Sequence, residues 1–352
     1  MGELLNKTLA SIKPLDKEAM RKASARQDTL IKPQGALGRL EEISITLAGI
    51  QRKAIPQIKN KAVVTMAGDH GVVAEKVGNY PQEVTPQMVL NFVNGGAAIN
   101  VIARQIGARV VVVNMGVAGD LPAEIPIVNK LVARGTANIA RGPAMSEAQA
   151  IQAIESGIEV INSEIDKGLD IVGTGDMGIG NTTPSAAICA VMTGQSVKNV
   201  TGRGTGLSDE QLEYKIGVIE KAITLNDPDA NNALDVLAKV GGFEIGGIAG
   251  VILGAAARGV PVVVDGFISG AAALIAEGLC AQAKDYMLLG HLSVEPGHRI
   301  MAEKLGLKPI VTLDLRLGEG TGAAIGIFIA ETSAKILAEM ATFGEAGVSE
   351  SE

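Results

Sequence analysis

The sequence predicts an α/β fold in which helices cover both faces of a mostly parallel sheet. Strand-like apolar runs alternate with helix-like segments along most of the 352 residues, an order that gives parallel strands joined by crossover helices. Hydrophobic residues make up 47% of the chain, whereas aromatic residues make up only 2% and 44 residues are glycine. An interior built from such small residues suits close packing of helices on a sheet.

The first 58 residues differ from the rest because they are charged and helical in pattern, with breaks at Pro14 and Pro33. We predict that residues 1–58 form the N-terminal part of a smaller helical domain. Residues 59–325 then form the large α/β domain, and residues 326–352 form a C-terminal helix that packs with the small domain.

Apolar runs mark the strands of the large domain. The clearest candidates are Ala62–Met66, Arg109–Met115, Asp170–Val172 and Val260–Asp265. A further strand is predicted to end just before Leu317. Because ligands bind at the carboxyl ends of parallel strands, the loops after Met66, Val172, Val264 and Leu315 are expected to meet at one rim.

Capping residues mark the helices. Thr85-Pro86 and Thr183-Pro184 each pair a capping threonine with a proline suited to the first helical position. Ser208 and Gln211 fit a capping box. The clearest predicted helices are Ser146–Lys167, Thr183–Val191, Ser208–Thr224 and Thr321–Thr342.

Two glycine-rich segments, Gly173–Pro184 and Leu313–Gly322, are the most informative features of the chain. Each passes from a buried strand through glycines that surround one acid, and then into a helix of small residues. Glycine lets backbone N–H groups approach a ligand closely, and the N-terminus of the following helix favours anions. The pair therefore predicts a site for a phosphorylated small molecule.

Glu319 is the leading candidate for proton transfer because it stands between Gly318 and Gly320, just before a helix. Its alternative role is to complement the helix dipole, which stabilises a protein by about 0.3–1 kcal/mol. That role does not require a glycine on each side of the acid. The pattern therefore favours catalysis.

Several classes of function are disfavoured. The net charge of −7 and the scarcity of Tyr and Phe argue against a nucleic-acid partner. Cys189 and Cys280 lie in apolar surroundings and are predicted to be reduced, buried thiols. The N-terminus has no signal-type apolar core, and charged residues interrupt the apolar stretch Phe243–Leu279, so we expect a cytoplasmic protein without stable membrane insertion.

Known motifs are either absent or weak. Gly173–Gly178 matches the dinucleotide pattern GxGxxG, but no acid lies between Gly178 and Asp209 to bind the ribose of NAD. Neither a Walker loop nor a GxSxG elbow is present. The three histidines, His70, His291 and His298, lack metal-ligand spacing, so no metal is expected.

Two features stay open at this level. His70 follows an acid and precedes a glycine, and it could either orient a loop or take part in chemistry. Gly202–Gly206 is a third glycine loop, equally compatible with a solvent turn and with a phosphate contact.

Taken together, five motifs in register resemble one family over nearly the whole chain, from about Lys32 to the final helix. That family is the nicotinate-nucleotide–dimethylbenzimidazole phosphoribosyltransferases, the base-activating enzymes of cobalamin nucleotide-loop assembly. The motifs are Lys32–Gly38, Ala67–Gly71, Tyr80–Thr85, Gly175–Pro184 and Leu313–Gly322.

The resemblance implies a homodimer with a large Rossmann-like parallel sheet and a small helical domain. It also implies a reaction in which nicotinate mononucleotide gives its phosphoribosyl group to 5,6-dimethylbenzimidazole, forming α-ribazole 5′-phosphate and nicotinate. No cofactor and no metal take part. The acceptor loses a ring-nitrogen proton as it attacks the ribose, and the family's general base falls on Glu319.

The resemblance also assigns the other site residues. Asp176 is expected to hold a water or assist the base, and Tyr80, Met88 and Met177 are expected to line the acceptor pocket. Lys215 matches a lysine near the family's site but also fits a solvated helix lysine. The predicted nucleotide-binding and phosphate-binding residues are Gly178, Gly180, Asn181, Thr182, Gly204, Lys215, Gly266, Ser293, Gly318 and Gly320.

The acceptor is not fixed by the sequence. The bulk of Tyr80 and the polarisable Met88 alter which aromatic base fits, so a purine, another benzimidazole or a phenol stays possible beside dimethylbenzimidazole. Two other classes of function also remain: an NAD-dependent oxidoreductase, resting on GxGxxG, and a non-catalytic sensor of nucleotides or bases. The intact Glu319 and glycine loops argue against the sensor.

Overall fold

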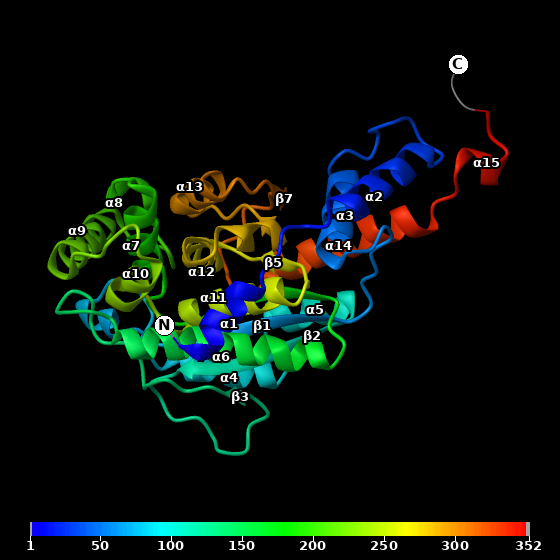
Figure 1. The fold of residues 1–352 in the computed structure, drawn as a ribbon. Coiled ribbons are helices and arrows are strands. Elements are labelled where there is room, and N and C mark those ends of the chain that lie inside the picture. The colour runs from blue at the N-terminus through cyan, green and yellow to red at the C-terminus, as the bar shows by residue number, and fades with distance from the viewer. Residues whose placement is uncertain (1, 350–352) are drawn as a thin grey trace.

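A computed structural model describes residues 2–349, and Figure 1 shows their fold. Seven strands form one sheet in the order β3-β2-β1-β4-β5-β6-β7, and every neighbouring pair is parallel. The predicted parallel α/β sheet is therefore confirmed. The strands are β1 (Lys61–Gly68), β2 (Ala108–Gly116), β3 (Val128–Asn129), β4 (Ile171–Met177), β5 (Val262–Val264), β6 (Met287–His291) and β7 (Pro309–Val311).

The strand order reverses at β1, which pairs with β2 on one side and with β4 on the other. Chain connections leave such a switch point in opposite directions, and a crevice forms outside the carboxyl ends of the two strands. The crevice in this fold lies beside Gly68 at the end of β1 and Met177 at the end of β4. The topology alone thus places a ligand site where both loops begin.

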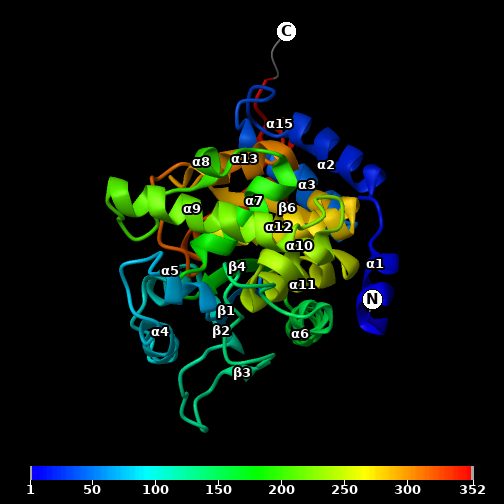
Figure 2. The ribbon, with the colours of Figure 1, turned by 90° about the vertical axis from the view of Figure 1, so that its left-hand side faces the viewer.

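Helices cover both faces of the sheet, as Figures 1 and 2 show. One face is covered by α11 (Phe243–Ala257) and α12 (Phe267–Leu279), with α6 (Glu147–Asp166) packed along α11. The other face is covered by α4 (Val84–Val93), α5 (Ala98–Ile106) and α14 (Thr321–Glu339). Buried apolar side chains fill both layers.

Some of the remaining helices pack beside α12. A group on the left of Figure 1 contains α7 (Thr182–Thr193), α8 (Val197–Val200), α9 (Asp209–Asn226) and α10 (Ala233–Val240). The other elements are α1 (Glu3–Ser11), η1 (Gly71–Glu75), η2 (Ala281–Tyr286), α13 (Pro296–Leu305) and α15 (Phe343–Ala346).

The N-terminal helices α2 (Lys17–Thr29) and α3 (Arg39–Gln51) pack on α14, on the right of Figure 1. The Arg26 guanidinium donates to the carbonyl oxygens of Leu337 and Ala338, at 2.7 and 3.2 Å. Helices from the two ends of the chain thus lie in contact. The proposed boundary at residue 325 falls inside α14, and a separate small domain stays a prediction.

Several predicted boundaries were wrong. Residues Gly173–Met177, expected as a loop, belong to strand β4, and the loop begins only at Gly178. Strand β7 ends at Val311, so the segment before Leu317 is a loop and not a strand. Strands β3 and β6 were not anticipated.

The two capping threonines also lie inside their helices. Helix α4 begins at Val84, so Thr85 falls in its first turn, where its hydroxyl accepts the Ile179 N–H at 3.1 Å. Helix α7 begins at Thr182, one residue before the predicted cap. The tertiary contact of Thr85 replaces the local cap that the sequence suggested. By contrast, the capping box of Ser208 is present.

The apolar stretch Phe243–Leu279 folds as α11, β5 and α12, as expected. In the described part of the chain, one helix, α14, is long and apolar enough to cross a membrane by length and composition. Over an 18-residue stretch of this helix, 56% is buried. The helix packs against the sheet and α3, as a core helix does. Cys189 is buried as predicted, whereas Cys280 is only partly buried; both are free.

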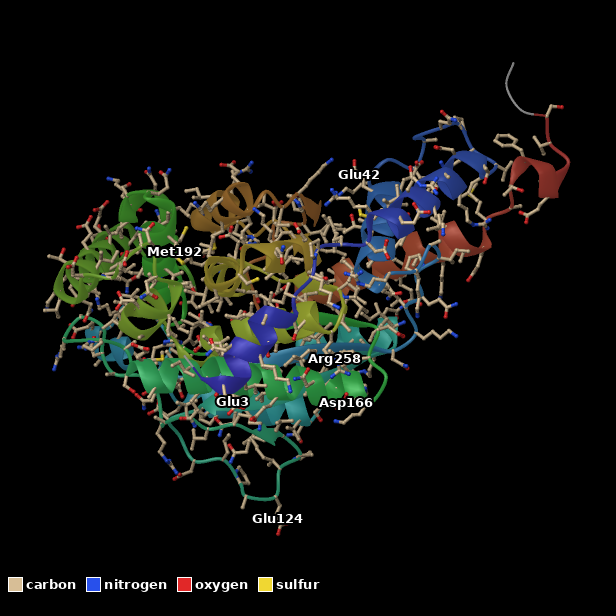
Figure 3. All side chains as sticks on the ribbon, in the orientation of Figure 1. Glu3, Glu42, Glu124, Asp166, Met192 and Arg258 are labelled. Atoms are coloured by element: carbon tan, nitrogen blue, oxygen red, sulfur yellow. The ribbon has the colours of Figure 1, made fainter. Side chains whose placement is uncertain are left out.

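Helices α6 and α11 cross with their backbones in contact. A Cβ at Gly250 would overlap the carbonyl oxygen of Ile154, and a Cβ at Gly157 would overlap that of Gly247. At one end of this helix pair, Arg258 and Asp166 form an ion pair at 3.0 Å, and Figure 3 shows them side by side. Gly157 and Gly250 therefore set the distance between α6 and α11.

We predict that Gly250→Ala lowers the free energy of unfolding by about 1–3 kcal/mol, because the added methyl group forces the two helices apart. Gly217, on α9, has open space around its Cβ position. The control Gly217→Ala should raise stability by about 0.5–1 kcal/mol through helix propensity. Urea unfolding of both variants measures this, and equal effects would contradict the crossing as the cause.

Candidate active site

A cavity of about 360 Å³ opens beyond the carboxyl ends of β4, β5 and β6. Most of the predicted site residues line it, so the expected convergence of loops at one rim is present. These residues are Tyr80, Asp176, Met177, Gly178, Asn181, Thr182, Gly204, Gly266, Ser293 and Gly318. A larger groove of about 450 Å³ lies between β3 and α6, but no predicted site residue lines it.

A smaller cavity of about 60 Å³ adjoins the first and contains the cationic end of the site. Lys215 is only 1% exposed, and its Nζ donates to the Thr182 hydroxyl at 2.7 Å. Burial lowers the pKa of Lys215 to about 8, against the opposing charge of Glu295. The solvated interpretation of Lys215 is therefore wrong, and Gly180 lies in the same cavity.

Glu295 fixes the third glycine loop, a role that sequence reasoning missed. Its Oε1 accepts the N–H of Gly204 at 3.1 Å, and Gly204 borders both cavities. Burial raises the pKa of Glu295, and the Lys215 charge opposes that shift. Gly202–Gly206 is thus part of the site wall and not a plain solvent turn.

The backbone of Glu319 is held at three points in the left-handed region, with φ 64°. Its N–H donates to the Asp176 carbonyl at 3.2 Å, and its carbonyl accepts the Thr65 hydroxyl at 3.0 Å. Strand β4 approaches so closely that a Cβ at Gly175 would overlap the Glu319 carbonyl oxygen. Such strained geometry at a non-glycine residue is typical of functional sites.

The Glu319 carboxylate is only 6% exposed, and its Oε2 accepts the N–H of Ile99 at 3.2 Å. Burial raises the pKa of Glu319, while this hydrogen bond acts in the opposite direction. Glu319 does not line the 360 Å³ cavity, although its neighbour Gly318 does. The carboxylate therefore lies just behind the cavity wall, at the first turn of α5.

Asp176 lies between the cavity and Glu319. Its Oδ2 accepts from the Asn181 side chain at 2.9 Å, and its Oδ1 has no partner within the described residues. Burial, followed by the charges of Asp265 and Glu244, raises the pKa of Asp176 well above its ordinary value. The raised pKa favours the protonated form of Asp176, which can donate a hydrogen bond.

Asp265 anchors the start of α14 beside the candidate base. Its two carboxylate oxygens accept the N–H groups of Gly320 and Ala323, at 3.1 and 2.9 Å. Burial raises the pKa of Asp265 to about 7, against these hydrogen bonds. Sequence analysis placed Asp265 at the end of a predicted strand; its position just before Gly266 was the available signal.

His70 lies behind the glycine loop, where its Nε2 is 2.8 Å from Glu244 Oε1, with both side chains buried. Burial disfavours the imidazolium, but the Glu244 carboxylate outweighs this and raises the pKa of His70. His70 does not line either cavity, an arrangement that favours its loop-orienting interpretation. Among residues 2–349, no group of three or more His, Cys, Asp or Glu side chains is placed to hold a metal ion.

The three residues predicted to line the acceptor-base pocket do not all line the cavity. Tyr80 stands at the rim with 51% of its surface exposed, and Met177 lines the cavity. Met88 does not line it, and instead packs against the apolar cluster that Met177 also contacts. Met88, like Glu319, therefore lies outside the lining of the cavity.

The fold and this anion-suited cavity agree with a comparison against known families. A phosphoribosyltransferase family model matches residues 12–348, which defines the class of the protein. The relatives identify the family more narrowly. A nicotinate-nucleotide–dimethylbenzimidazole phosphoribosyltransferase from Dehalococcoides mccartyi strain BAV1 is 63% identical, with 99% of each chain covered. One from Roseiflexus sp. RS-1 is 58% identical, with 98% of each chain covered.

Solved structures agree with these relatives. The crystal structure of the enzyme of that name from Thermus thermophilus superimposes with a TM-score of 0.90 at 45% identity, covering 96% of this chain and all of that one. A structure from the same organism described as CobT gives a TM-score of 0.91 at 46% identity, covering 95% of this chain and all of that one. The chain belongs to the nicotinate-nucleotide–dimethylbenzimidazole phosphoribosyltransferase family, whose members are pentosyltransferases.

Lys215 makes stability depend on pH in a predictable direction. Its pKa in the folded chain is about 8, below the ordinary 10.5. The unfolded chain therefore binds more protons between pH 8 and 10.5, and stability rises with pH in that window. We predict that the stability of wild type relative to Lys215→Met increases there by up to about 3 kcal/mol.

Chemical denaturation at a series of pH values measures this difference. Lys221→Met, at an exposed position on the same helix, should show no comparable change. A flat difference between wild type and Lys215→Met from pH 8 to 10.5 would show that Lys215 is not desolvated in solution.

Proposed function

We propose that this protein transfers the phosphoribosyl group of nicotinate mononucleotide to 5,6-dimethylbenzimidazole or a related base. The products are α-ribazole 5′-phosphate and nicotinate, and the reaction serves cobalamin nucleotide-loop assembly. Family membership supports this assignment, as does a cavity at the carboxyl ends of β4, β5 and β6 that is large enough for a small nucleotide. We further propose that the enzyme is a cytoplasmic homodimer that needs no cofactor, as in the family.

The phosphate belongs at the cationic end of the site. Lys215 makes one hydrogen bond, to Thr182, so its remaining N–H groups are available to an anion. The N-terminus of the twelve-residue helix α7 begins at the same place, and its dipole favours negative charge. A bound phosphate would also restore a charged partner to the desolvated ammonium, and so hold it protonated.

The reaction requires a base and a good leaving group. A nitrogen of the acceptor forms a bond to ribose C1, while the proton of the acceptor's N–H passes to the Glu319 carboxylate. The bond from C1 to nicotinate breaks, and its electron pair neutralises the pyridinium nitrogen. Attack from the face opposite nicotinate inverts C1 and gives the α-ribotide. Positioning and electrostatics supply the rest of the acceleration.

The observation that carries this mechanism is the different environment of two adjacent carboxyl groups. Asp176 is buried beside other acids, which raises its pKa and favours the protonated form that donates a hydrogen bond. The pKa of Glu319 is raised by burial, but Ile99 N–H favours its ionised form. A carboxylate with a moderately raised pKa is a better base near neutrality, which supports Glu319 as the base and Asp176 as its assistant.

The acceptor would enter between Tyr80 and Met177, on the side of the site where Met88 lies. Because Met88 lies outside the cavity in the free chain, an acceptor must displace or adjoin it. Thioether side chains adapt to differently shaped rings. This supports a pocket that accepts dimethylbenzimidazole together with other flat bases.

We predict that Glu319→Gln lowers kcat by about 10²–10⁴-fold, the usual contribution of a general base. The purified enzyme is incubated with nicotinate mononucleotide and an equimolar mixture of dimethylbenzimidazole, benzimidazole, adenine and p-cresol. Mass spectrometry should detect an α-ribotide together with released nicotinate. Glu303→Gln, at an exposed position on α13, should retain full turnover.

The outcomes separate the alternatives. If Glu319→Gln keeps full turnover and Asp176→Asn loses most of it, the general base is Asp176 and not Glu319. No ribotide from any acceptor would contradict the proposed reaction and favour the sensor. Binding of NADH, seen by fluorescence titration, would instead favour the oxidoreductase.

A further inference from the structure

The carboxylate of Glu319 occupies the place of a helix cap for α5. The residue before α5 is Ala97, which has no side-chain acceptor for the free N–H groups of the first turn. The N–H of Ile99, in that turn, donates instead to Glu319 Oε2 at 3.2 Å, across 220 residues of sequence. The Glu319 carboxylate therefore caps the N-terminus of α5, and the same hydrogen bond fixes the position of that carboxylate.

Asn100 fixes this N-terminus. Its side chain is buried, Oδ1 accepts the N–H of Ala97 at 3.1 Å, and Nδ2 donates to the Phe92 carbonyl at 3.0 Å. These two bonds tie the end of α4 to the first turn of α5. Asn100 lines neither of the two site cavities. Its side chain acts on the site through the backbone that presents Ile99 N–H.

We infer that Asn100 is a positioning residue for the base: by fixing the first turn of α5, it aims the Ile99 N–H at Glu319, a hydrogen bond that favours the ionised carboxylate. The inference rests on the proposed function, because it assumes that Glu319 is the base. It adds a residue that the sequence motifs do not contain.

The charges around Glu319 make this contact decisive. The titratable groups nearest to it are themselves carboxyl groups: Asp176 at the end of β4 and Asp265 after β5, with Glu244 of α11 beyond Asp176. None of these groups is a cation that would favour the ionised form of Glu319, and burial raises its pKa. His291, at the end of β6, lies 3.7 Å from Asp265, and burial lowers its pKa, so it is neutral near pH 7. The Ile99 N–H is therefore the contact that favours the carboxylate.

The test is the pH profile of kcat/KM for Asn100→Ala. Loss of the fixed N–H raises the pKa of Glu319, so the base is protonated up to a higher pH. The acid limb should move upward by about 0.5–1 pH unit, and activity should approach the wild-type plateau above it. The matched control is Asn226→Ala, because Asn226, at the end of α9 and away from the site, is also buried and donates to the carbonyl oxygens of Ala222 and Ile139.

Asn226→Ala should lower the melting temperature without moving the acid limb. An unshifted limb in Asn100→Ala, or an equal shift in Asn226→Ala, overturns the inference. A second variant, Ile99→Pro, removes the N–H itself at a first-turn position where proline is tolerated. It should shift the limb in the same direction, and failure to do so also counts against the inference.

Failure of the inference and failure of the proposed function give different results. If Glu319→Gln retains turnover, Glu319 is not the base, and the proposed mechanism fails whatever Asn100→Ala does. If Glu319→Gln is inactive while the acid limb of Asn100→Ala is unshifted, Glu319 is still the general base and only the role inferred for Asn100 is wrong.

Discussion

The contact between Gly175 in β4 and the backbone of Glu319 is the constraint on which the rest of the site depends. It brings the start of α14 against the sheet so closely that no side chain fits between them. Glu319 is thereby held in a left-handed conformation that glycine adopts far more readily. The surrounding hydrogen bonds to Asp176, Thr65 and Asp265 offset the cost of that conformation, which is about 1 kcal/mol or more.

Burial of charge follows from the same packing. Closing α14 onto the strand ends removes Asp176, Asp265 and Glu319 from water together, and each pKa rises for that reason. The effect on each group differs with its partners, so adjacent carboxyl groups can hold different protonation states. At the opposite end of the site, burial lowers the pKa of Lys215, and the charge of Glu295 opposes that shift. A phosphorylated ligand bound beside Lys215 would stabilise the folded protein by linkage.

Much of the fold could be predicted from the sequence because local pattern and topology agree. The alternation of strands and helices predicted the parallel sheet, and the position of Glu319 between two glycines predicted its place beside the site. Contacts that no local pattern encodes were missed. Gly173 and Gly175 resemble a loop in sequence, yet they are strand residues required by the close approach of α14. The roles of Asp265 and Asn100 depend on backbone groups far away in the chain.

The most direct test of this account is the turnover of Gly175→Ala at saturating nicotinate mononucleotide, measured beside the binding of that nucleotide. The added methyl group should displace Glu319 and lower kcat by about 100-fold, as expected when a catalytic group moves by about 1 Å. Nucleotide affinity should change little, because Lys215 and Thr182 lie at the other end of the cavity. Wild-type turnover in a folded Gly175→Ala enzyme would contradict the claim that this contact positions the base.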